Sequence, residues 1–403
     1  MPAVFLSAGE ASGEHYGALL IEAIRSHSPE ATFFGLGGQR MERLGLRRIV
    51  RAEDVAVMGI TEVLRHMPRI YREYRRLKAS LRGGGDPRQR PDVAILIDFP
   101  DVNLRLAREL HRLGVPVIFF VSPQLWAWKR RRIRHVQRFV DRMVVIFPFE
   151  EPFYRDRGVA ADFVGHPLAD LQLPTISRQQ FAAEYNLDAA RQWIGLLPGS
   201  RPREIRLNLP EMLKAAAALG DEFEFLLPLA PTLTGVQVRQ VAHEVRAASL
   251  RVTLVKDARA ALFHSRASIV ASGTATVEAA LIGNPFVVVY RLSRLSYAVA
   301  SRVVKVPFVA MVNLVAGREI VPELIQDNFT ASNIVLRMRP LLQDQIAREA
   351  MQSDLSEVAS LLRLPGTETA IGRVADIALE LAGTHLAPAL SERKSHQQSV
   401  AAE

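Results

Sequence analysis

A turn after an apolar run has the residue types of an anion-binding site. Residues 193–197 lead into Pro198, Gly199, Ser200 and Arg201, and a helical pattern follows. Gly199 lets the backbone approach a phosphate, Ser200 can cap the helix, and Arg201 adds charged donors beside the free N–H groups of the helix start. An ordinary strand-to-helix loop has a similar composition, so phosphate binding and simple capping both stay open for this turn alone.

A second turn of this kind follows the apolar residues 269–271. Ser272, Gly273 and Thr274 lead into another helical pattern, and Glu278 falls one turn later on the same helix face as Thr274. A carboxylate at that place could hold a ribose, and the alternative is an N-capped helix with a solvated glutamate. Two such turns in one half of the chain favour a nucleotide site.

Two carboxylates in the first half follow expected strands. Asp98 comes directly after the apolar residues 93–97, where it could act as a general base or cap the next helix. Glu14 lies in a glycine-bearing turn that also contains Ser12 and Gly13. This turn lacks the G-x-G-x-x-G spacing, and no acid ends the second expected strand, so a dinucleotide-dependent dehydrogenase is disfavoured.

Strands and helices alternate along both halves of the chain. The expected strands are continuous apolar runs, at residues 3–7, 32–36, 93–97, 117–121, 143–147, 194–197, 223–227, 252–254, 269–271 and 286–289. Such runs separated by helices are typical of parallel sheets covered on both faces. We therefore predict an α/β protein with two doubly wound domains, joined by a linker at residues 168–177. Because ligands bind beyond the carboxyl ends of such strands, both domains should contribute loops to one interdomain cleft.

Composition is that of a globular chain with two buried cores, since 49% of the 403 residues are hydrophobic. The chain has no cysteine, and its histidines lack ligand spacing, so neither disulfides nor a metal site is predicted. Interrupted apolar runs predict no transmembrane helix, and the absence of a basic leader predicts a cytoplasmic location.

Positive charge is concentrated in two stretches, and the formal net charge is +9. In one of them, arginines alternate with apolar residues at helical spacing, namely Ile60, Val63, Leu64, Met67, Ile70 and Tyr71. Such a helix could lie on an anionic membrane surface or pack on its own sheet with a solvated basic face. No helix-turn-helix, zinc finger or aromatic RNA-binding signature accompanies the arginines, so nucleic-acid binding is disfavoured.

These motifs together resemble the lipid-A-disaccharide synthase family, glycosyltransferases of Gram-negative bacteria, over residues 4–381. The resemblance rests on A-G-E-A-S-G-E at 8–14, V-M-G-I at 57–60, I-D-F-P-D-V-N at 97–103, V-S-P-Q-L-W-A-W at 121–128, L-P-G-S-R at 197–201, A-S-G-T-A-T at 271–276 and N-L-V-A-G-R-E at 313–319. Glu14 stands where many relatives have aspartate, which weakens the inference of a strict catalytic role for it.

The resemblance implies a GT-B fold, and four parts of the chain are expected. The first three are an acceptor-binding and membrane-docking domain at 1–170, a UDP-sugar-binding domain at 171–340, and terminal helices at 341–383 that cross back to the first domain. The fourth is an extra tail at 384–403, where this chain departs from the family; its polar composition, low in aromatic residues, predicts disorder. The resemblance also implies that UDP-2,3-diacylglucosamine donates its sugar to 2,3-diacylglucosamine 1-phosphate with inversion, which yields lipid A disaccharide 1-phosphate and UDP. The alternative is a sugar-nucleotide epimerase of the same fold, and a non-catalytic basic membrane-binding adaptor is less favoured.

The expected partners are these two substrates and an anionic membrane, at which the protein would be peripheral on the inner face of the inner membrane. Nucleic acid, a cofactor and a metal ion are not expected, and a homodimer is compatible with this set.

Site residues follow from the resemblance by position. Inversion requires a base for the acceptor 6-hydroxyl, for which Asp98 is the first candidate and Glu14 the second. Ser12, Gly13 and Asn103 would line the acceptor side, although Ser12 and Gly13 could instead only shape their turn. The UDP-sugar would contact Gly199, Ser200, Arg201, Ser272, Gly273, Thr274, Glu278, Asn313 and Gln326. The neighbouring Arg318 and Glu319 could form a structural ion pair.

Overall fold

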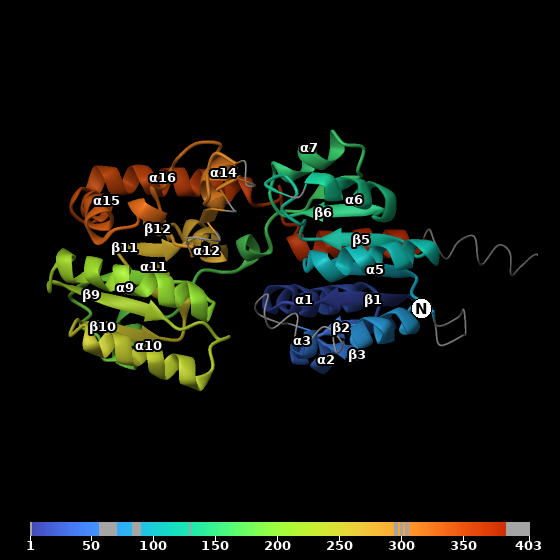
Figure 1. Ribbon diagram of the computed structural model, residues 1–403, viewed down its shortest axis with the longest axis horizontal. Helices are drawn as coiled ribbons and strands as arrows, with labels where there is room; N and C mark the ends of the chain where they lie inside the picture. The colour runs from blue at the N-terminus through green and yellow to red at the C-terminus, as the bar shows by residue number, and fades with distance from the viewer. Residues whose placement is uncertain are drawn as a thin grey trace, which may run out of the picture. The chain divides into compact units, whose positions relative to one another are not determined.

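The computed structural model describes residues 2–55, 71–82, 90–128, 130–293, 297–298, 301–302 and 306–383. The chain forms two compact units, which Figure 1 shows in ribbon form. Unit 1 consists of Met1–Pro167 and Arg363–Glu403, and unit 2 of Leu168–Leu362. Each unit contains one parallel sheet with helices on both faces, which confirms the predicted α/β class.

The sheet of unit 1 has seven strands in the order β3-β2-β1-β4-β5-β6-β7. Their bounds are β1 (Ala3–Ala8), β2 (Thr32–Gly37), β3 (Leu46–Arg51), β4 (Val93–Ile97), β5 (Val117–Phe120), β6 (Arg142–Val145) and β7 (Ala161–Phe163). The helices are α1 (Ala11–His27), α2 (Gln39–Arg43), α3 (Ala52–Val55), α5 (Pro100–Arg112), α6 (Ile133–Phe139), α7 (Glu150–Arg155) and helical residues 71–80 and 370–383. Because side chains alternate along a strand, Val4 and Leu6 face α1 and residues 370–383, whereas Phe5 faces α5 and α6.

The sheet of unit 2 has six strands in the order β10-β9-β8-β11-β12-β13. Their bounds are β8 (Gln192–Leu197), β9 (Phe223–Pro228), β10 (Val252–Val255), β11 (Ala267–Ala271), β12 (Phe286–Tyr290) and β13 (Glu323–Ile325). The helices are α8 (Arg178–Tyr185), α9 (Pro202–Leu219), α10 (Gly235–Ala247), α11 (Ala258–His264), α12 (Thr274–Ile282), α14 (Met311–Ala316), α15 (Ala331–Gln343) and α16 (Gln345–Leu361). One core lies between one face of this sheet and the helices α9, α10 and α15. A smaller core lies between the other face of the sheet and the helices α8 and α11.

The return of the chain to unit 1 begins later than expected. The helix α16 packs against α12, α14 and α15 and so belongs to unit 2. The part that returns begins at Arg363 rather than at residue 341, because the apolar face of α16 is used within unit 2. The division at Pro167 falls three residues before the expected boundary at 170. The expected tail at 384–403 lies outside the described residues.

No helix among the described residues is long and apolar enough to cross a bilayer. Of the expected docking residues, Ile60, Val63, Leu64, Met67 and Ile70 lie outside the described part of the chain, and Tyr71 is exposed on the helix at 71–80.

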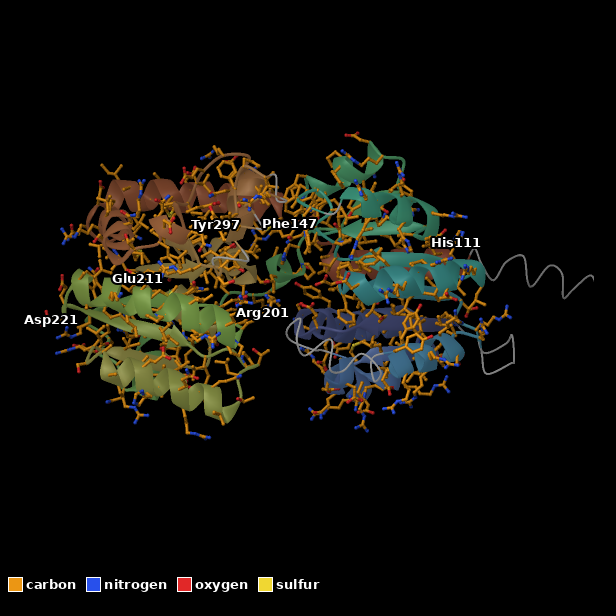
Figure 2. All side chains as sticks on the ribbon, viewed as in Figure 1. His111, Phe147, Arg201, Glu211, Asp221 and Tyr297 are labelled. Atoms are coloured by element: carbon orange, nitrogen blue, oxygen red, sulfur yellow. The ribbon has the colours of Figure 1, made fainter. Side chains whose placement is uncertain are left out.

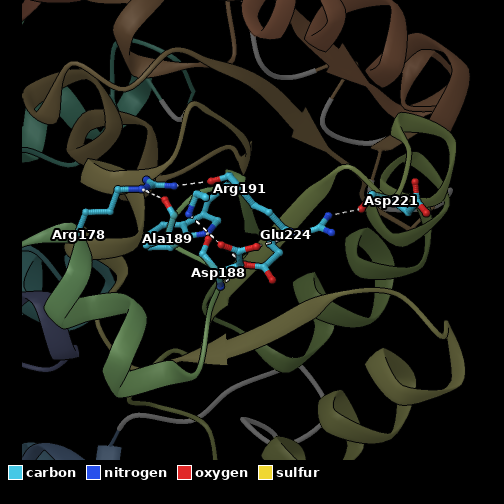
Figure 3. A network of polar contacts seen from close by, with 8 residues as sticks. Arg178, Asp188, Ala189, Arg191, Asp221 and Glu224 are labelled. Carbon is cyan, nitrogen blue, oxygen red and sulfur yellow. Dashed lines mark hydrogen bonds and ion pairs between the residues drawn. The ribbon is translucent and has the colours of Figure 1, made fainter.

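A cluster of polar contacts around Arg178 links α8 to the amino end of β8 (Figure 3). Its guanidinium donates hydrogen bonds to the backbone oxygens of Ala189 (3.0 Å), Arg191 (2.6 Å) and His264 (2.7 Å). It also lies 3.6 Å from the centre of the Trp193 ring, as in a cation–π contact. A single side chain therefore satisfies three carbonyl groups, two in the loop before β8 and one at the end of α11.

The Arg178→Met variant should lower the free energy of unfolding of unit 2 by about 2–4 kcal/mol, because three charge-assisted hydrogen bonds and the ring contact are lost. Urea unfolding measures this change. Arg239→Met, at an exposed position of α10, is the matched control and should change stability by less than about 0.5 kcal/mol. Equal stability of the two variants would contradict the role of Arg178.

Candidate active site

The carboxyl ends of β1 and β4 are joined by a buried amide. These strands are neighbours in the sheet, with Ala8 paired to Ile97. The Ser7 hydroxyl donates to Oδ1 of Asn103 (2.6 Å), and Nδ2 of Asn103 donates to the backbone oxygens of Ile97 (3.1 Å) and Asp98 (2.7 Å). Asn103 was predicted to line the acceptor side, but it is fully buried and instead holds the two strand ends together.

Asp98 lies in an unusual turn at the end of β4. Asp98 and the next residue, Phe99, both have positive φ angles, 46° and 50°, which side-chain-bearing residues rarely adopt. The Asp98 N–H donates to the backbone oxygen of Phe120 (2.9 Å), and Phe99 is the N-cap residue of α5. The ring of Phe99 covers Gly9, where an added Cβ would lie 2.4 Å from it. Backbone strain of this kind clusters at functional sites, and here it presents a half-buried carboxylate at the end of a central strand.

Glu14 contacts the next strand end, that of β2. Its Oε1 accepts the N–H of Arg40 in α2 at 2.8 Å, so the carboxylate stabilises the start of that helix. A Cβ added at Gly38 would lie 2.1 Å from the carboxyl group. Gly13 packs against β1 and β4, whereas Ser12 is exposed. Glu14 thus has a structural contact that the sequence did not predict.

In unit 2, a carboxylate of the chain itself occupies part of the first predicted anion site. Arg201, labelled in Figure 2, is the N-cap residue of α9, so Ser200 is not the cap as expected. Oε2 of Glu204 accepts the N–H groups of Ser200 (3.2 Å) and Arg201 (3.3 Å), and Oε1 accepts Nη1 of Arg201 (3.0 Å). The expectation of free N–H groups at this helix start is therefore wrong for these two. Gly199, at φ 122°, lies directly under Glu204.

The second predicted turn lies beside the first, because β8 and β11 are paired. Gly273 is the N-cap residue of α12 with φ 151°, a conformation that favours glycine, and an added Cβ would meet open space there. Thr274 is exposed at the same helix start. The Ser272 hydroxyl donates to the backbone oxygen of Val309 (3.3 Å). The helix start of α12 is thus accessible to a ligand.

Glu278 lies one turn into α12 and is half-buried. Burial raises the pKa of its carboxyl group, nearby Asp257 raises it further, and Arg259 lowers it. A carboxyl group whose pKa burial raises, beside a helix start at the end of a strand, is a candidate for a functional site.

Asn313 and Gln326, both predicted for the nucleotide site, contact the protein backbone. Asn313 is fully buried, accepts the N–H groups of Ile320 (2.8 Å) and Val321 (3.0 Å), and donates to Glu323 (2.8 Å). Oε1 of Gln326 accepts the N–H of Leu292 (3.1 Å), and Nε2 of Gln326 donates to the backbone oxygen of Leu292 (3.3 Å). These amides therefore shape the loops around the carboxyl ends of β12 and β13.

One further side chain, Glu323, was not predicted from the sequence, and Arg318 has other partners than expected. Glu323 accepts the N–H groups of Val309 (2.8 Å) and Ala310 (2.9 Å) before α14. Arg318, expected as a partner of Glu319, instead pairs with Asp354 (2.9 Å) and Glu357 (3.1 Å) of α16. Among the described residues, no three metal-ligating side chains gather at one point.

Comparison with known proteins shows to which family this chain is similar. A family model described as "Lipid-A-disaccharide synthetase" matches residues 4–370. Proteins named lipid-A-disaccharide synthase are similar to this chain. The one from Acidobacterium capsulatum is 64% identical, covering 94% of this chain and 96% of its own length, and the one from Koribacter versatilis is 49% identical, covering 94% and 98%.

Solved structures share the fold at low sequence identity. A glycosyltransferase of kitacinnamycin has a TM-score of 0.61 at 13% identity over 94% of this chain and 99% of its own. A UDP-GlcNAc 2-epimerase from Neisseria meningitidis, bound to UDP-GlcNAc, has a TM-score of 0.59 at 14% identity, covering 94% of this chain and 98% of its own. The two-domain GT-B fold is thus shown, and it is common to transferases and epimerases.

Proposed function

The chain belongs to the lipid-A-disaccharide synthase family, a glycosyltransferase family of lipid A disaccharide synthesis, and from this we propose its substrates and the roles of its residues. The donor is UDP-2,3-diacylglucosamine and the acceptor is 2,3-diacylglucosamine 1-phosphate. The products are lipid A disaccharide 1-phosphate and UDP. An epimerase is not favoured, since the similar sequences are synthases and the epimerases share only the fold.

Asp98 is the base of an inverting displacement. The 6-hydroxyl oxygen of the acceptor attacks the anomeric carbon of the donor, the bond from that carbon to UDP breaks, and the hydroxyl proton passes to the Asp98 carboxylate. The observation that carries this assignment is the strained turn at the end of β4, where two consecutive residues have positive φ. Asn103 and the Phe120 carbonyl fix the backbone of that turn. Ser12 and Gly13 line the acceptor side, and Gly13 packs against Ile97 at the same strand end.

Unit 2 binds the UDP-sugar. Support comes from two adjacent turns at the carboxyl ends of β8 and β11, the accessible helix start at Gly273, and the half-buried Glu278. Arg201 neutralises charge that grows on the departing UDP, and Glu278 holds the ribose. The diphosphate competes with Glu204 for the donors around Ser200 and Arg201.

The decisive experiment is UDP release from the donor with and without the acceptor. Acceptor-dependent release, with a new β(1→6) disaccharide, is the expected result. Release or rearrangement of the UDP-sugar without acceptor would instead indicate an epimerase or hydrolase, and absence of any turnover would overturn the proposed substrates.

The Arg201→Met variant should lower kcat by about 10²–10³-fold, because a cationic donor to the leaving group is lost. Steady-state UDP release measures the effect. Arg206→Met, at an exposed position of the same helix, should stay within about two-fold of the wild type. A change in the KM of the donor alone would show that Arg201 contributes binding but not leaving-group stabilisation.

The protein works as a peripheral membrane protein on the inner face of the inner membrane. Support comes from the net charge of +9, from the basic stretch that includes Tyr71, and from the acyl chains of both proposed substrates. Tyr71 has 63% of its surface exposed, as suits a residue at a lipid interface.

A further inference from the structure

Glu150 is a buried carboxylate that the proposed mechanism does not use. It is the first residue of α7 and is 2% exposed. Oε1 accepts the Ser122 hydroxyl (2.9 Å) and the Trp126 indole N–H (3.0 Å), and Oε2 accepts the N–H of Phe147 (3.2 Å). A buried carboxylate is costly, so its retention at this place calls for an explanation.

The segment that Glu150 holds begins in a strained conformation. Val121, the residue after β5, has a φ angle of 64°, a genuine outlier for a β-branched side chain. Its N–H donates to the backbone oxygen of Val144 in the next strand, β6 (3.1 Å). The Tyr154 hydroxyl contacts Ser122 (3.1 Å) and the backbone oxygen of Pro123 (3.2 Å). Strain persists where surrounding contacts outweigh it, and here these contacts converge on the segment 121–128.

Aromatic packing adds to this arrangement. The rings of Trp126 and Phe149 are 5.0 Å apart, edge to face, and Phe149 stacks on Phe147 at 5.8 Å. Phe147 in turn contacts the buried His166, at 5.4 Å. The turn before α7 therefore packs on the 121–128 segment, with Glu150 as the polar link between them.

The same segment adjoins Asp98. The N–H of Asp98 donates to the oxygen of Phe120, and Phe120 directly precedes the strained Val121. A change in the conformation of 121–128 therefore passes to Asp98 through one peptide group. Trp128, at the far end of the segment, is 40% exposed.

We propose that Glu150 is a positioning residue, which holds the segment 121–128 in the conformation that places Asp98 and the acceptor sugar for reaction. This inference rests on the proposed acceptor role of unit 1. The groups that Glu150 contacts are a hydroxyl, an indole and backbone N–H groups, and its titratable neighbours are Tyr154 and, beyond Phe147, His166. Each of these groups donates a hydrogen bond to Glu150, so the ionised carboxylate can accept all of them. A proton on Glu150 perturbs the hydrogen bonds from Ser122 and Trp126.

Kinetics of the full chain test the proposal, with each substrate varied in turn. In Glu150→Gln, kcat/KM for the acceptor should fall by about 10–100-fold, while KM for the UDP-sugar stays within about two-fold. Glu151→Gln is the matched control, because Glu151 is the next residue but contacts Arg155 (2.8 Å) and the N–H of Phe163 (3.3 Å), both outside the segment 121–128. A rise in the KM for the UDP-sugar beyond about two-fold, or an unchanged kcat/KM for the acceptor, would overturn the proposal.

A fluorescence titration gives a second measurement that needs no activity. Because Trp126 donates to Glu150, tryptophan emission of the wild type and of Glu151→Gln should change between about pH 5 and pH 8, and that of Glu150→Gln should not. Should Glu150→Gln fail to fold, Tyr154→Phe should lower acceptor kcat/KM by about two- to ten-fold through the same segment. A wild type without acceptor-dependent UDP release would refute the proposed function, whereas identical titrations in all variants would refute the role of Glu150.

Discussion

Asp98→Asn is expected to lower kcat by about 10²–10⁴-fold, the usual contribution of a general base. The amide cannot accept the proton of the acceptor hydroxyl, yet it has nearly the same size as the carboxyl group. The backbone contacts of Asp98 with Phe120 and Asn103 do not involve the side chain, so the turn should persist in the variant. Single-turnover UDP release at saturating substrates measures the loss directly.

The control for this prediction lies three residues away. Asp101 is exposed in the first turn of α5 and pairs with Arg132 (2.6 Å), so Asp101→Asn should keep activity within about two-fold. Glu14→Gln should cost less than Asp98→Asn, because Glu14 already accepts the N–H of Arg40. A larger loss in Glu14→Gln than in Asp98→Asn would assign the base to Glu14 instead.

The central strands could be predicted from the sequence because they are buried on both faces. The run at β4 is wholly apolar, and those at β1, β8 and β12 are nearly so, as is typical of parallel strands between two helical layers. Edge strands give a weaker signal. In β3, Arg47 and Arg51 are exposed and only Leu46 and Val50 are buried, and β7 and β13 have only three residues each. The sequence of these short stretches does not distinguish a strand from a loop, because they become strands only by pairing with a neighbouring strand of the sheet.

The candidate site shows the same division between local and long-range signals. The turns at Gly199 and Gly273 could be found because glycine and hydroxyl residues follow strands directly. The contact of Glu204 with Arg201 also has a local signal, since an acid at the third helical position is typical of a capping box. The environment of Glu150 was not predictable, because its partners Ser122 and Trp126 lie 28 and 24 residues away and an acid at a helix start is ordinarily solvated.

The stability of unit 1 should depend on pH through Glu150. Burial raises the pKa of this carboxyl group from 4.5 to about 7, although hydrogen bonds from Ser122 and Trp126 lower it in part. Between these two pH values the folded protein binds a proton that the unfolded chain has released. The contribution of Glu150 to stability is therefore fully present below about pH 4.5 and is lost as the pH rises through about 7.

The loss should reach about 3 kcal/mol by pH 8, since one pKa unit corresponds to about 1.4 kcal/mol. Urea unfolding of wild type and Glu150→Gln across this range measures it as the difference between the two stability curves, because other titrating groups are common to both proteins. The wild type should become less stable relative to Glu150→Gln as the pH rises. Glu151→Gln is the matched control, because Glu151 is the next residue of α7 and pairs with Arg155. Parallel curves for wild type and Glu150→Gln would mean that Glu150 keeps an ordinary pKa, and that the hydrogen bonds from Ser122, Trp126 and Phe147 offset the whole cost of its burial.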